Sequence, residues 1–530
     1  MPEPEQTPPA GDAKPPESAP AAAVEKPGAP KALSREDVER SLDYSIKDGT
    51  AYSAMVGFGD TYLTPFALRL GATNAEIGLL VGLPQLFASV AQQVSAHVTE
   101  RFRKRRSIIV AHAFLQGLMW LPILLTPFLF PQTPVPFLIL FACLYAGFAA
   151  FAALPWASMM GDLVPEDSRG AYFGKRNEIT GFAAFVTAAV AGSALGWFDA
   201  NGELFKAVAA PGDSWLVGFS FIFFVAFLAR MVSVGYLKKM SEPAYEPAPG
   251  QKLSLFDFVR RMRKEDFGVF TLYAALTQFA TNLAAPFFTV YVLQVLEFDY
   301  GTFAIFMAAL TFTQLISMTY WGSLADKYGN KTVLNVAGFL IPIVPLLWLF
   351  SQQPTYLIFA HAVSGFAWAG FNLLTFNYVL DATEPSTRPR YIAHFNFLNT
   401  GAVFAGALLG GVLAAFFADK RLDVFPGFAI EGLLLLFMVS GLLRLIIASA
   451  LLPKVKETRL RYDINEHEFF WKVTAIYPAR GVIQQLEGAW HLGEGAIKLG
   501  AKSIRTIEEK TAAETVKLGE KLKRKIAKKK

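Results

Sequence analysis

Charge is scarce in this chain of 530 residues. Asp, Glu, Lys and Arg together make up 17% of it, whereas hydrophobic residues make up 53%. The mean hydropathy is +0.36. A soluble protein of this length would need more charge to cover its surface, so the composition excludes an ordinary soluble enzyme and indicates a membrane protein.

Cysteine is nearly absent, because Cys143 is the single one and lies inside an apolar run. This excludes a disulfide framework and a cysteine-based metal site. The sequence also shows no phosphate-cradling loop, histidine cluster or paired midplane carboxylates, which argues against an ATP-driven pump and an intramembrane enzyme. We therefore expect no catalytic residues, no metal and no cofactor.

Long apolar runs are abundant. A bilayer core about 30 Å thick requires roughly 20 apolar residues per helix. Runs of this kind, bounded by Gly, Pro or charge, lie at 51–70, 75–98, 107–130, 135–159, 178–198, 215–237, 267–296, 301–324, 332–350, 354–380, 394–418 and 427–452. The sequence thus predicts an all-α integral membrane protein with twelve transmembrane helices.

Basic residues gather in every second connection between these spans, for example in "ERFRKRRS", "EDSRGAYFGKRN" and "STRPRY". The intervening connections, such as "PQTP" and "SQQP", carry little basic charge. Because Lys and Arg remain on the cytoplasmic side, we expect a multi-pass protein of the cell (inner) membrane with both termini in the cytoplasm.

The two halves of the chain repeat each other. Polar positions after span four recur after span ten at one constant offset, which pairs Asp162 with Asp381, Arg169 with Arg388, Tyr172 with Tyr391 and Asn177 with Asn396. Spans six and twelve carry Arg230 and Arg444 at matching positions. Parallel repeats of six helices are a known transporter architecture, with the substrate site between the halves.

This repeat predicts two pseudo-symmetric six-helix bundles, at 41–237 and 267–455. Residues 1–40 are rich in Pro and Ala, lack the segments of a signal peptide and are expected to form a disordered tail. Helical order is expected to begin near Ser34. The connection 238–266 is expected to be a cytoplasmic linker with a short amphipathic helix. Residues 456–530 are expected to form a basic amphipathic tail.

The stretch "GSLADKYGNK" between spans eight and nine resembles the loop signature of the major facilitator superfamily. The matching residues are Gly322, Leu324, Asp326, Lys327, Gly329 and Lys331. The corresponding loop of the first half, "AHVTERFRKR", keeps Glu100 and Arg101 but has Ala96 and Arg103 where the signature has glycine. The resemblance covers about residues 45–455 and implies two bundles that rock about a central cavity.

The same resemblance implies a cytoplasmic gate, in which Asp326 docks onto span five near Asn177 when that side closes, and Glu100 mirrors it toward span eleven. Gly322 would allow a close helix approach, and Gly329 a turn with positive φ. The alternative is a solvated turn that only enforces orientation. Ion-pair clusters are expected around Asp162, Glu166 and Arg169 and around Asp381, Glu384 and Arg388, the alternative being ordinary cytoplasmic charge.

Asp60 is the outstanding charge within a span. It lies about nine residues into span one, hence ~14 Å from its inner end and close to the midplane. Charge in hydrocarbon is costly and is therefore a functional hypothesis by default. Asp60 could exchange a proton or pair with a cationic substrate, or it could serve structure alone through a bond to a neighbouring helix.

Other polar groups lie on the presumed cavity helices. Arg230 and Arg444 are interpreted as structural charges that pair with loop acids, with a substrate role as the alternative. Cavity candidates are Tyr145, Gln278, Asn282, Trp368 and Asn372. Amides beside aromatic rings suit an uncharged or amphipathic small solute, although they serve equally well to hold helices together.

Together these features favour a secondary active transporter of a small molecule, coupled to protons and working by alternating access as a monomer. The alternative function is a transporter-shaped sensor or scaffold that acts through its basic C-terminal tail. The end of that tail, "KLKRKIAKKK", would be attracted to anionic lipids. A nucleic-acid partner is not expected, because no groove-reading motif accompanies the basic residues.

Overall fold

The computed structural model of the chain describes residues 33–165, 169–205, 214–244, 260, 266–383, 388–425 and 428–457. Several expectations lie outside these residues. They concern most of the N-terminal tail, the amphipathic helix of the linker, the basic C-terminal tail beyond Glu457, the side chains of Glu166 and Glu384, and the side chain of Arg388.

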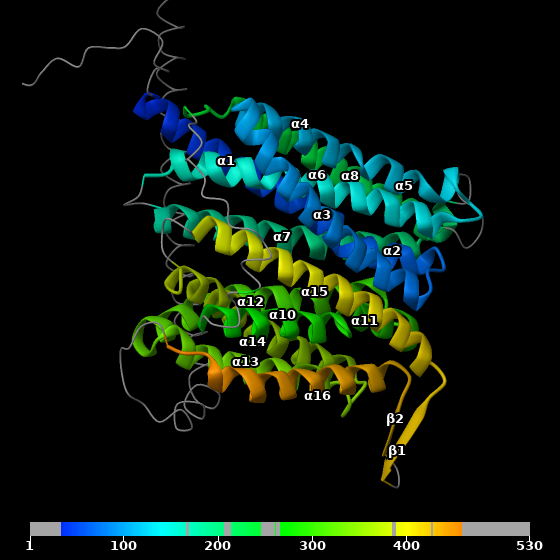
Figure 1. Cartoon of the computed structure of the whole chain (residues 1–530). Coiled ribbons are helices and arrows are strands. Elements are labelled where there is room, and N and C mark those ends of the chain that lie inside the picture. Colours follow the sequence, from blue (N-terminus) through cyan, green and yellow to red (C-terminus); the bar gives the residue numbers. More distant parts are fainter. Residues whose placement is uncertain are drawn as a thin grey trace, which may run out of the picture.

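Two groups of helices run side by side (Figure 1). The first consists of α1 (Arg35–Phe58), α2 (Asp60–Arg69), α3 (Asn74–Phe102), α4 (Arg105–Leu118), α5 (Trp120–Leu129), α6 (Pro134–Leu163), α7 (Arg169–Ala200) and α8 (Ser214–Lys239). The second consists of α10 (Asp266–Asn282), α11 (Ala285–Val290), α12 (Tyr300–Tyr328), α13 (Asn330–Leu347), α14 (Pro354–Asp381), α15 (Arg388–Phe417) and α16 (Leu433–Leu451). We call them the N bundle and the C bundle.

Among the described residues, eleven helices are long and apolar enough to cross a membrane. The remaining expected span corresponds to α1 and α2, which together are more polar. The helix begins at Arg35 rather than near residue 51, because Ser34 caps it by accepting the backbone N–H of Asp37 at 3.1 Å. Ion pairs four residues apart, such as Lys47–Asp43 at 2.7 Å, also line its surface. The start expected near Ser34 is confirmed.

Three spans are interrupted near their middles. α1 ends at Phe58 and α2 begins at Asp60, because Gly59 lies directly against the ring of Trp120, where a side chain would not fit. α4 gives way to α5 at Met119, and α10 to α11 at Leu283 and Ala284. The break at Gly59 places Asp60 at the N-terminus of a helix inside the bundle, where backbone N–H groups favour negative charge.

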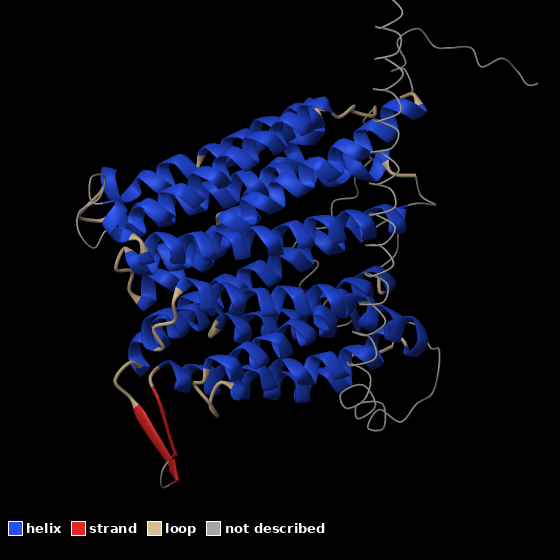
Figure 2. Ribbon diagram, turned by 180° about the vertical axis from the view of Figure 1, so that it is seen from behind, coloured by secondary structure: helices blue, strands red, loops and turns tan. Residues whose placement is uncertain are grey.

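A β-hairpin projects from one end of the molecule (Figures 1 and 2). Strand β1 (Arg421–Phe425) pairs antiparallel with β2 (Phe428–Glu431). These residues were predicted to lie partly in span twelve, which was wrong, since α16 begins only at Leu433. We call this end of the molecule the hairpin end, and the opposite one, where Ser34 lies, the α1 end.

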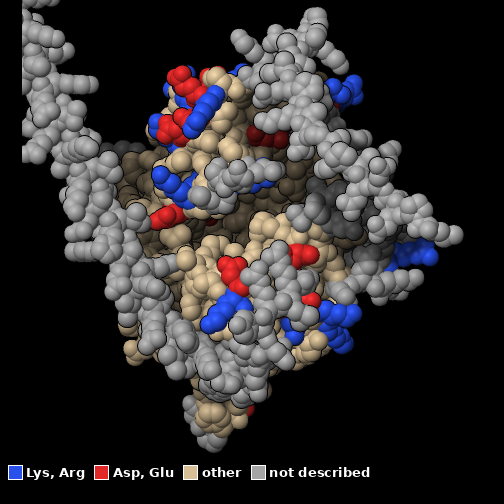
Figure 3. All heavy atoms as spheres, turned by 90° about the vertical axis from the view of Figure 1, so that its left-hand side faces the viewer, with Lys and Arg blue, Asp and Glu red and all other residues tan. Residues whose placement is uncertain are grey.

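Glycines bring the two bundles together toward the hairpin end. A side chain on Gly78 of α3 would lie 2.5 Å from the carbonyl oxygen of Ala407 on α15, and one on Gly411 would lie 3.0 Å from Cα of Ala75. Gly192 of α7 packs in the same way against Ala304 of α12. Figure 3 looks onto the α1 end and shows a recess between the two bundles. The structure is therefore closed at the hairpin end.

Candidate functional site

Asp60 is the first residue of α2 and follows the break after α1, so it lies in the middle of span one. Its side chain is nevertheless exposed. The hydroxyl of Tyr145 on α6 donates a hydrogen bond of 2.7 Å to Oδ1 of Asp60. Tyr145 is itself buried, and its ring packs edge-on against Trp120 at 5.0 Å between centroids. The carboxylate is thus held by a fixed donor while it stays open to the space beside α1.

A second polar group lies twelve residues earlier on α1, at a cavity of about 230 Å³ within the N bundle. Here Asp48 and Arg230 are linked through Ser233, and all three are buried. The hydroxyl of Ser233 donates to Oδ1 of Asp48 at 2.6 Å and accepts from Nη1 of Arg230 at 2.8 Å. The guanidinium of Arg230 also lies 4.8 Å from the centre of the Tyr52 ring.

Arg176 of α7 lines the same cavity, together with Gln116 of α4 and Trp156 of α6. Its guanidinium lies 4.6 Å from the centre of the Trp156 ring. Asp48, Gln116 and Arg176 were not predicted as site residues. Span one was expected to start at residue 51 and Arg176 was interpreted as loop charge, so both charges were assigned to the water outside the bilayer. The polar positions of α1 at helical spacing were the signal that could have identified Asp48.

The expectation that Arg230 and Arg444 pair with loop acids is wrong. Arg230 reaches Asp48, an acid on a helix, through Ser233. The hydrogen bonds of Arg444 go to neutral oxygens: the hydroxyl of Ser440 at 3.1 Å and the carbonyls of Ile341 and Thr281 at 3.4 and 3.3 Å. Their structural role stays a prediction.

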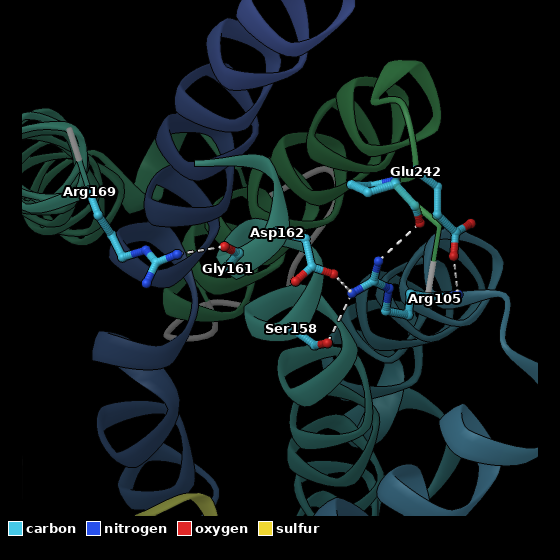
Figure 4. A network of polar contacts seen from close by, with 7 residues as sticks. Arg105, Ser158, Gly161, Asp162, Arg169 and Glu242 are labelled. Carbon is cyan, nitrogen blue, oxygen red and sulfur yellow. Dashed lines mark hydrogen bonds and ion pairs between the residues drawn. The ribbon is translucent and has the colours of Figure 1, made fainter. Parts of the chain in front are cut away.

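At the α1 end of the N bundle, Arg105 connects the starts and ends of three helices (Figure 4). Its guanidinium donates to Asp162 at 2.5 Å, to Ser158 at 3.0 Å and to the carbonyl of Pro243 at 3.0 Å. Its backbone N–H donates to Glu242 at 2.5 Å. The expected pairing of Asp162 with Arg169 is not what the structure shows, since Arg169 donates to the carbonyl of Gly161 at 2.9 Å.

The C bundle repeats this arrangement at the start of α13. Asn330 donates to Asp381 at 2.5 Å, as Arg105 does to Asp162. Glu457 accepts the backbone N–H groups of Lys331 and Thr332 at 3.0 and 3.2 Å, as Glu242 does at α4. The sequence repeat therefore corresponds to a repeated set of contacts at both helix starts.

Of the two expectations for the glycines of the loop signature, one is confirmed and one is wrong. Gly329 has φ +91° and ends α12 before α13, so the expected turn with positive φ is confirmed. Gly322 does not mediate a close helix approach, because a side chain there would lie 3.7 Å from Leu373, an ordinary contact distance. Asp326 and Lys327 are exposed at the end of α12. Their role in a gate stays a prediction.

The remaining candidates are spread over the two bundles. Glu100 and Arg101 are exposed at the end of α3, and Asn177 is exposed on α7. Asn282 donates to the carbonyl of Gln278 on its own helix at 2.9 Å, Trp368 packs edge-on against Phe371, and Asn372 is exposed. Of the predicted cavity residues, Tyr145 is the one that the structure brings to Asp60.

Comparison with known proteins identifies this architecture. The family model of the Major Facilitator Superfamily matches residues 50–310 and 270–483. The chain belongs to this superfamily, and its fold is that of a multi-pass membrane transporter.

Solved structures share the fold over most of the chain. The nucleoside transporter NupG aligns with a TM-score of 0.57 at 12% identity, covering 79% of this chain and 99% of NupG. A bacterial homologue of the human lysosomal transporter Spinster, in an inward-facing and unoccupied conformation, aligns with a TM-score of 0.59 at 16% identity, covering 82% of this chain and all of that one. The D-xylose–proton symporter has a TM-score of 0.57 at 14% identity, covering 80% and 98%.

Curated relatives match over shorter stretches. An uncharacterized transporter of Buchnera aphidicola subsp. Schizaphis graminum (strain Sg) is 22% identical over 112 residues, which are 21% of this chain and 27% of the relative. The probable efflux pump gsfJ of Penicillium aethiopicum is 30% identical over 101 residues, which are 19% and 17%. The matched stretches thus span about a quarter or less of these relatives.

Proposed function

We propose that this protein is a secondary active transporter that moves a small solute by alternating access, with protons as the coupling ion and Asp60 as the coupling carboxylate. The α1 end is assigned to the cytoplasm, because the basic connections lie there and Lys and Arg remain on that side of a membrane. The single observation that carries the proposal is an exposed carboxylate in the middle of a span that also accepts a hydrogen bond from buried Tyr145.

Alternating access requires that the two bundles separate at one end while they touch at the other. The glycine contacts of Gly78 and Gly411 lie toward the hairpin end, and the recess lies at the α1 end. These features support a state open to the cytoplasm. Contacts of about 1–3 kcal/mol made in one state only are enough to bias such an equilibrium.

Proton coupling is supported by the placement of Asp60. A charge in a membrane-spanning segment is costly, so a carboxylate there gains from taking up a proton when the substrate or the conformation changes its surroundings. Tyr145 holds one oxygen of the carboxylate at 2.7 Å, and the N-terminus of α2 favours the charged form. The carboxylate of Asp60 therefore has neighbours that favour its charged form, and its exposed side leaves a path by which a proton can reach it.

The direction of transport is the finer question. The relative from Penicillium aethiopicum is described as a probable efflux pump, and a structural neighbour as a proton symporter. Export in exchange for protons and import together with protons are both consistent with one carboxylate in the cavity wall. Flux measured under opposite pH gradients distinguishes the two.

The test is flux in proteoliposomes against a panel of small metabolites, with and without a pH gradient, for the wild type and Asp60→Asn. We expect the gradient to drive accumulation in the wild type and not in Asp60→Asn, which should still exchange substrate across the membrane. The matched control is Asp43→Asn, an exposed carboxylate of the same helix that pairs with Lys47. Gradient-driven uptake that survives in Asp60→Asn would remove Asp60 from the mechanism.

A further inference from the structure

The cavity within the N bundle has more positive than negative charge on its walls. Arg176 and Arg230 face it together with a single carboxylate, that of Asp48. Asp48 is already linked to Arg230 through Ser233. Asp48 also attracts the half-buried Arg176, so on the cavity walls one carboxylate serves two guanidinium groups. Charges within a membrane protein are paired or mark a functional site.

The hydrogen-bonding capacity of the same walls is also incompletely used. Within the described residues, the side chain of Arg176 makes one hydrogen bond, from Nε to the carbonyl of Ser45 at 3.3 Å. That of Arg230 makes one, through Nη1. Among the described residues, the buried donors Nε of Arg230, Nε1 of Trp156 and Nε2 of Gln116 have no acceptor, whereas one buried acceptor of these walls, Oε1 of Gln116, has no donor. Buried donors are nearly always satisfied in proteins, so this excess of donors indicates a missing acceptor.

The fold itself does not require this polar cavity. At the offset that pairs Asp162 with Asp381, the counterpart of Arg176 is Phe395. Phe395 is buried in an aromatic cluster with Phe267 and Phe270, whose ring centroids lie 6.3 and 5.9 Å from its own. The C bundle thus fills with aromatic rings the position that the N bundle leaves hollow and charged. The difference indicates a role beyond packing.

We propose that this cavity binds the carboxylate of a small organic monoanion, which is the anionic group of the transported substrate. Arg176 offers a planar pair of donors that matches a carboxylate, while Tyr52 and Trp156 form aromatic walls for the rest of the molecule. Asp48, which lines the same cavity, repels a second negative charge. The inference rests on the proposed transport function, because it names the substrate class for it.

The size of the cavity fits this class. Its volume of about 230 Å³ accommodates several non-hydrogen atoms but not a large lipid or peptide. Ala149, Ala152 and Ala153 of α6 line one side, and their short side chains keep the space open. Replacing one of them with a larger residue fills the cavity while every charge stays in place.

The test is binding by the purified full-length chain in detergent, followed as the shift of the thermal unfolding temperature. The probes are matched pairs of acid anion and neutral amide: propionate with propanamide, and benzoate with benzamide, with sodium chloride as the salt control. A ligand that binds the folded state alone raises its stability with concentration. We expect at least one acid anion to stabilise the wild type and its amide to have no effect.

Binding of the anion by substituted proteins then tests where the site lies. Arg176→Gln is expected to weaken binding of the anion about tenfold or more, as expected for a lost charge-assisted hydrogen bond. Ala153→Leu is expected to abolish binding with the charges unchanged, and it keeps the test open if Arg176→Gln does not fold. Arg106→Gln is the matched control, since Arg106 is exposed on α4 and bonds the carbonyl of Met240.

Amide binding as strong as that of the acid would overturn the inference, as would an Ala153→Leu protein that binds like the wild type. Absence of stabilisation by all four probes, with flux of an uncharged solute in proteoliposomes, would overturn the anion site and leave the transport function standing. Anion binding lost in Ala153→Leu, without flux of any solute, would support the site and reject transport.

Discussion

Arg105 donates a hydrogen bond to Asp162 at 2.5 Å although its own side chain has no exposed surface. Asp162 is half exposed, so water screens part of the interaction. The pair joins the start of α4 to the end of α6, and Glu242 and the carbonyl of Pro243 complete it from the segment after α8. One buried guanidinium thereby fixes three helix ends of the N bundle.

Arg105→Gln should destabilise the protein, because it leaves Ser158, Asp162 and the carbonyl of Pro243 without their shared donor. We expect a loss of about 1–3 kcal/mol, reduced from the value for a fully buried pair because Asp162 is half exposed. Thermal unfolding in detergent measures it. Arg106→Gln is the control and should stay within about 0.5 kcal/mol. Equal losses for both variants would show that Arg105 has no special role.

Gly78→Val should shift the protein away from the state described here. Its side chain would collide with the carbonyl of Ala407, so α3 and α15 could not pack as they do. Overpacking costs about 1–3 kcal/mol, and because it acts in this state alone it should change the ratio of the two states about 5- to 150-fold. Distances between spin labels at the hairpin end, measured before and after substitution, report the shift.

The control for Gly78 is Gly174→Ala, since a side chain at Gly174 of α7 meets nothing within 4 Å. Its distance distribution should match that of the wild type. If Gly78→Val also leaves the distribution unchanged, the packing of α3 on α15 is not what closes the hairpin end.

Asp299→Ala should weaken the start of α12. Asp299 accepts the side-chain hydroxyl of Thr302 at 2.6 Å and the backbone N–H groups of Gly301 and Thr302 at 2.8 and 3.0 Å. These hydrogen bonds, that of the Thr302 hydroxyl first, hold the pKa of Asp299 below its ordinary value. Loss of such a cap costs ~1 kcal/mol.

The pH dependence of this loss follows from the sign of the shift. A lowered pKa in the folded state stabilises the protein above the ordinary carboxyl value of about 3.9, and this stabilisation disappears as the pH falls through the folded value. The difference between wild type and Asp299→Ala should therefore be constant near pH 7 and shrink in acid. Asp423→Ala, in the exposed β1, is the control. A difference that does not change down to pH 3 contradicts the assignment.

Truncation after Glu457 should leave transport intact, whereas truncation after Leu452 should impair folding. Glu457 accepts the backbone N–H groups of Lys331 and Thr332, so the shorter chain loses the cap of α13. Flux in proteoliposomes and thermal unfolding distinguish the two truncated chains. If the protein is instead a scaffold that acts through its basic tail, the chain that ends at Glu457 should show no flux, like the full-length protein.

Much of the fold could be predicted from the sequence, because long apolar runs are local patterns and the repeat that aligns Asp162 with Asp381 is visible when the two halves are compared. Span one was placed too late, at residue 51, although a helix start was expected near Ser34, because the first turns of α1 are polar and become part of the bundle only through contact with α7 and α8. The β-hairpin was missed because β1 and β2 are short and bear no distinct signal between two apolar helices.

The candidate site was harder to predict than the fold. Asp60 stood out because a lone acid inside an apolar run is visible in the sequence alone, and Tyr145, one of the predicted cavity residues, donates a hydrogen bond to it. Asp48 and Arg176 were missed because their burial arises from helices far apart in the sequence. The partner of Asp162 was misjudged for the same reason: Arg169 is near in sequence, but Arg105 is near in space.

Arg69 of α2 donates to the hydroxyl of Tyr300 at 2.8 Å and to Asp199 at 3.1 Å, and Tyr300 belongs to the other bundle. Every turnover would have to rupture this bond and remake it. A stronger bond would slow its opening, and a weaker one would let the hairpin end leak. At about 1.5–3 kcal/mol for a hydrogen bond from a charged donor, thermal motion suffices to open it.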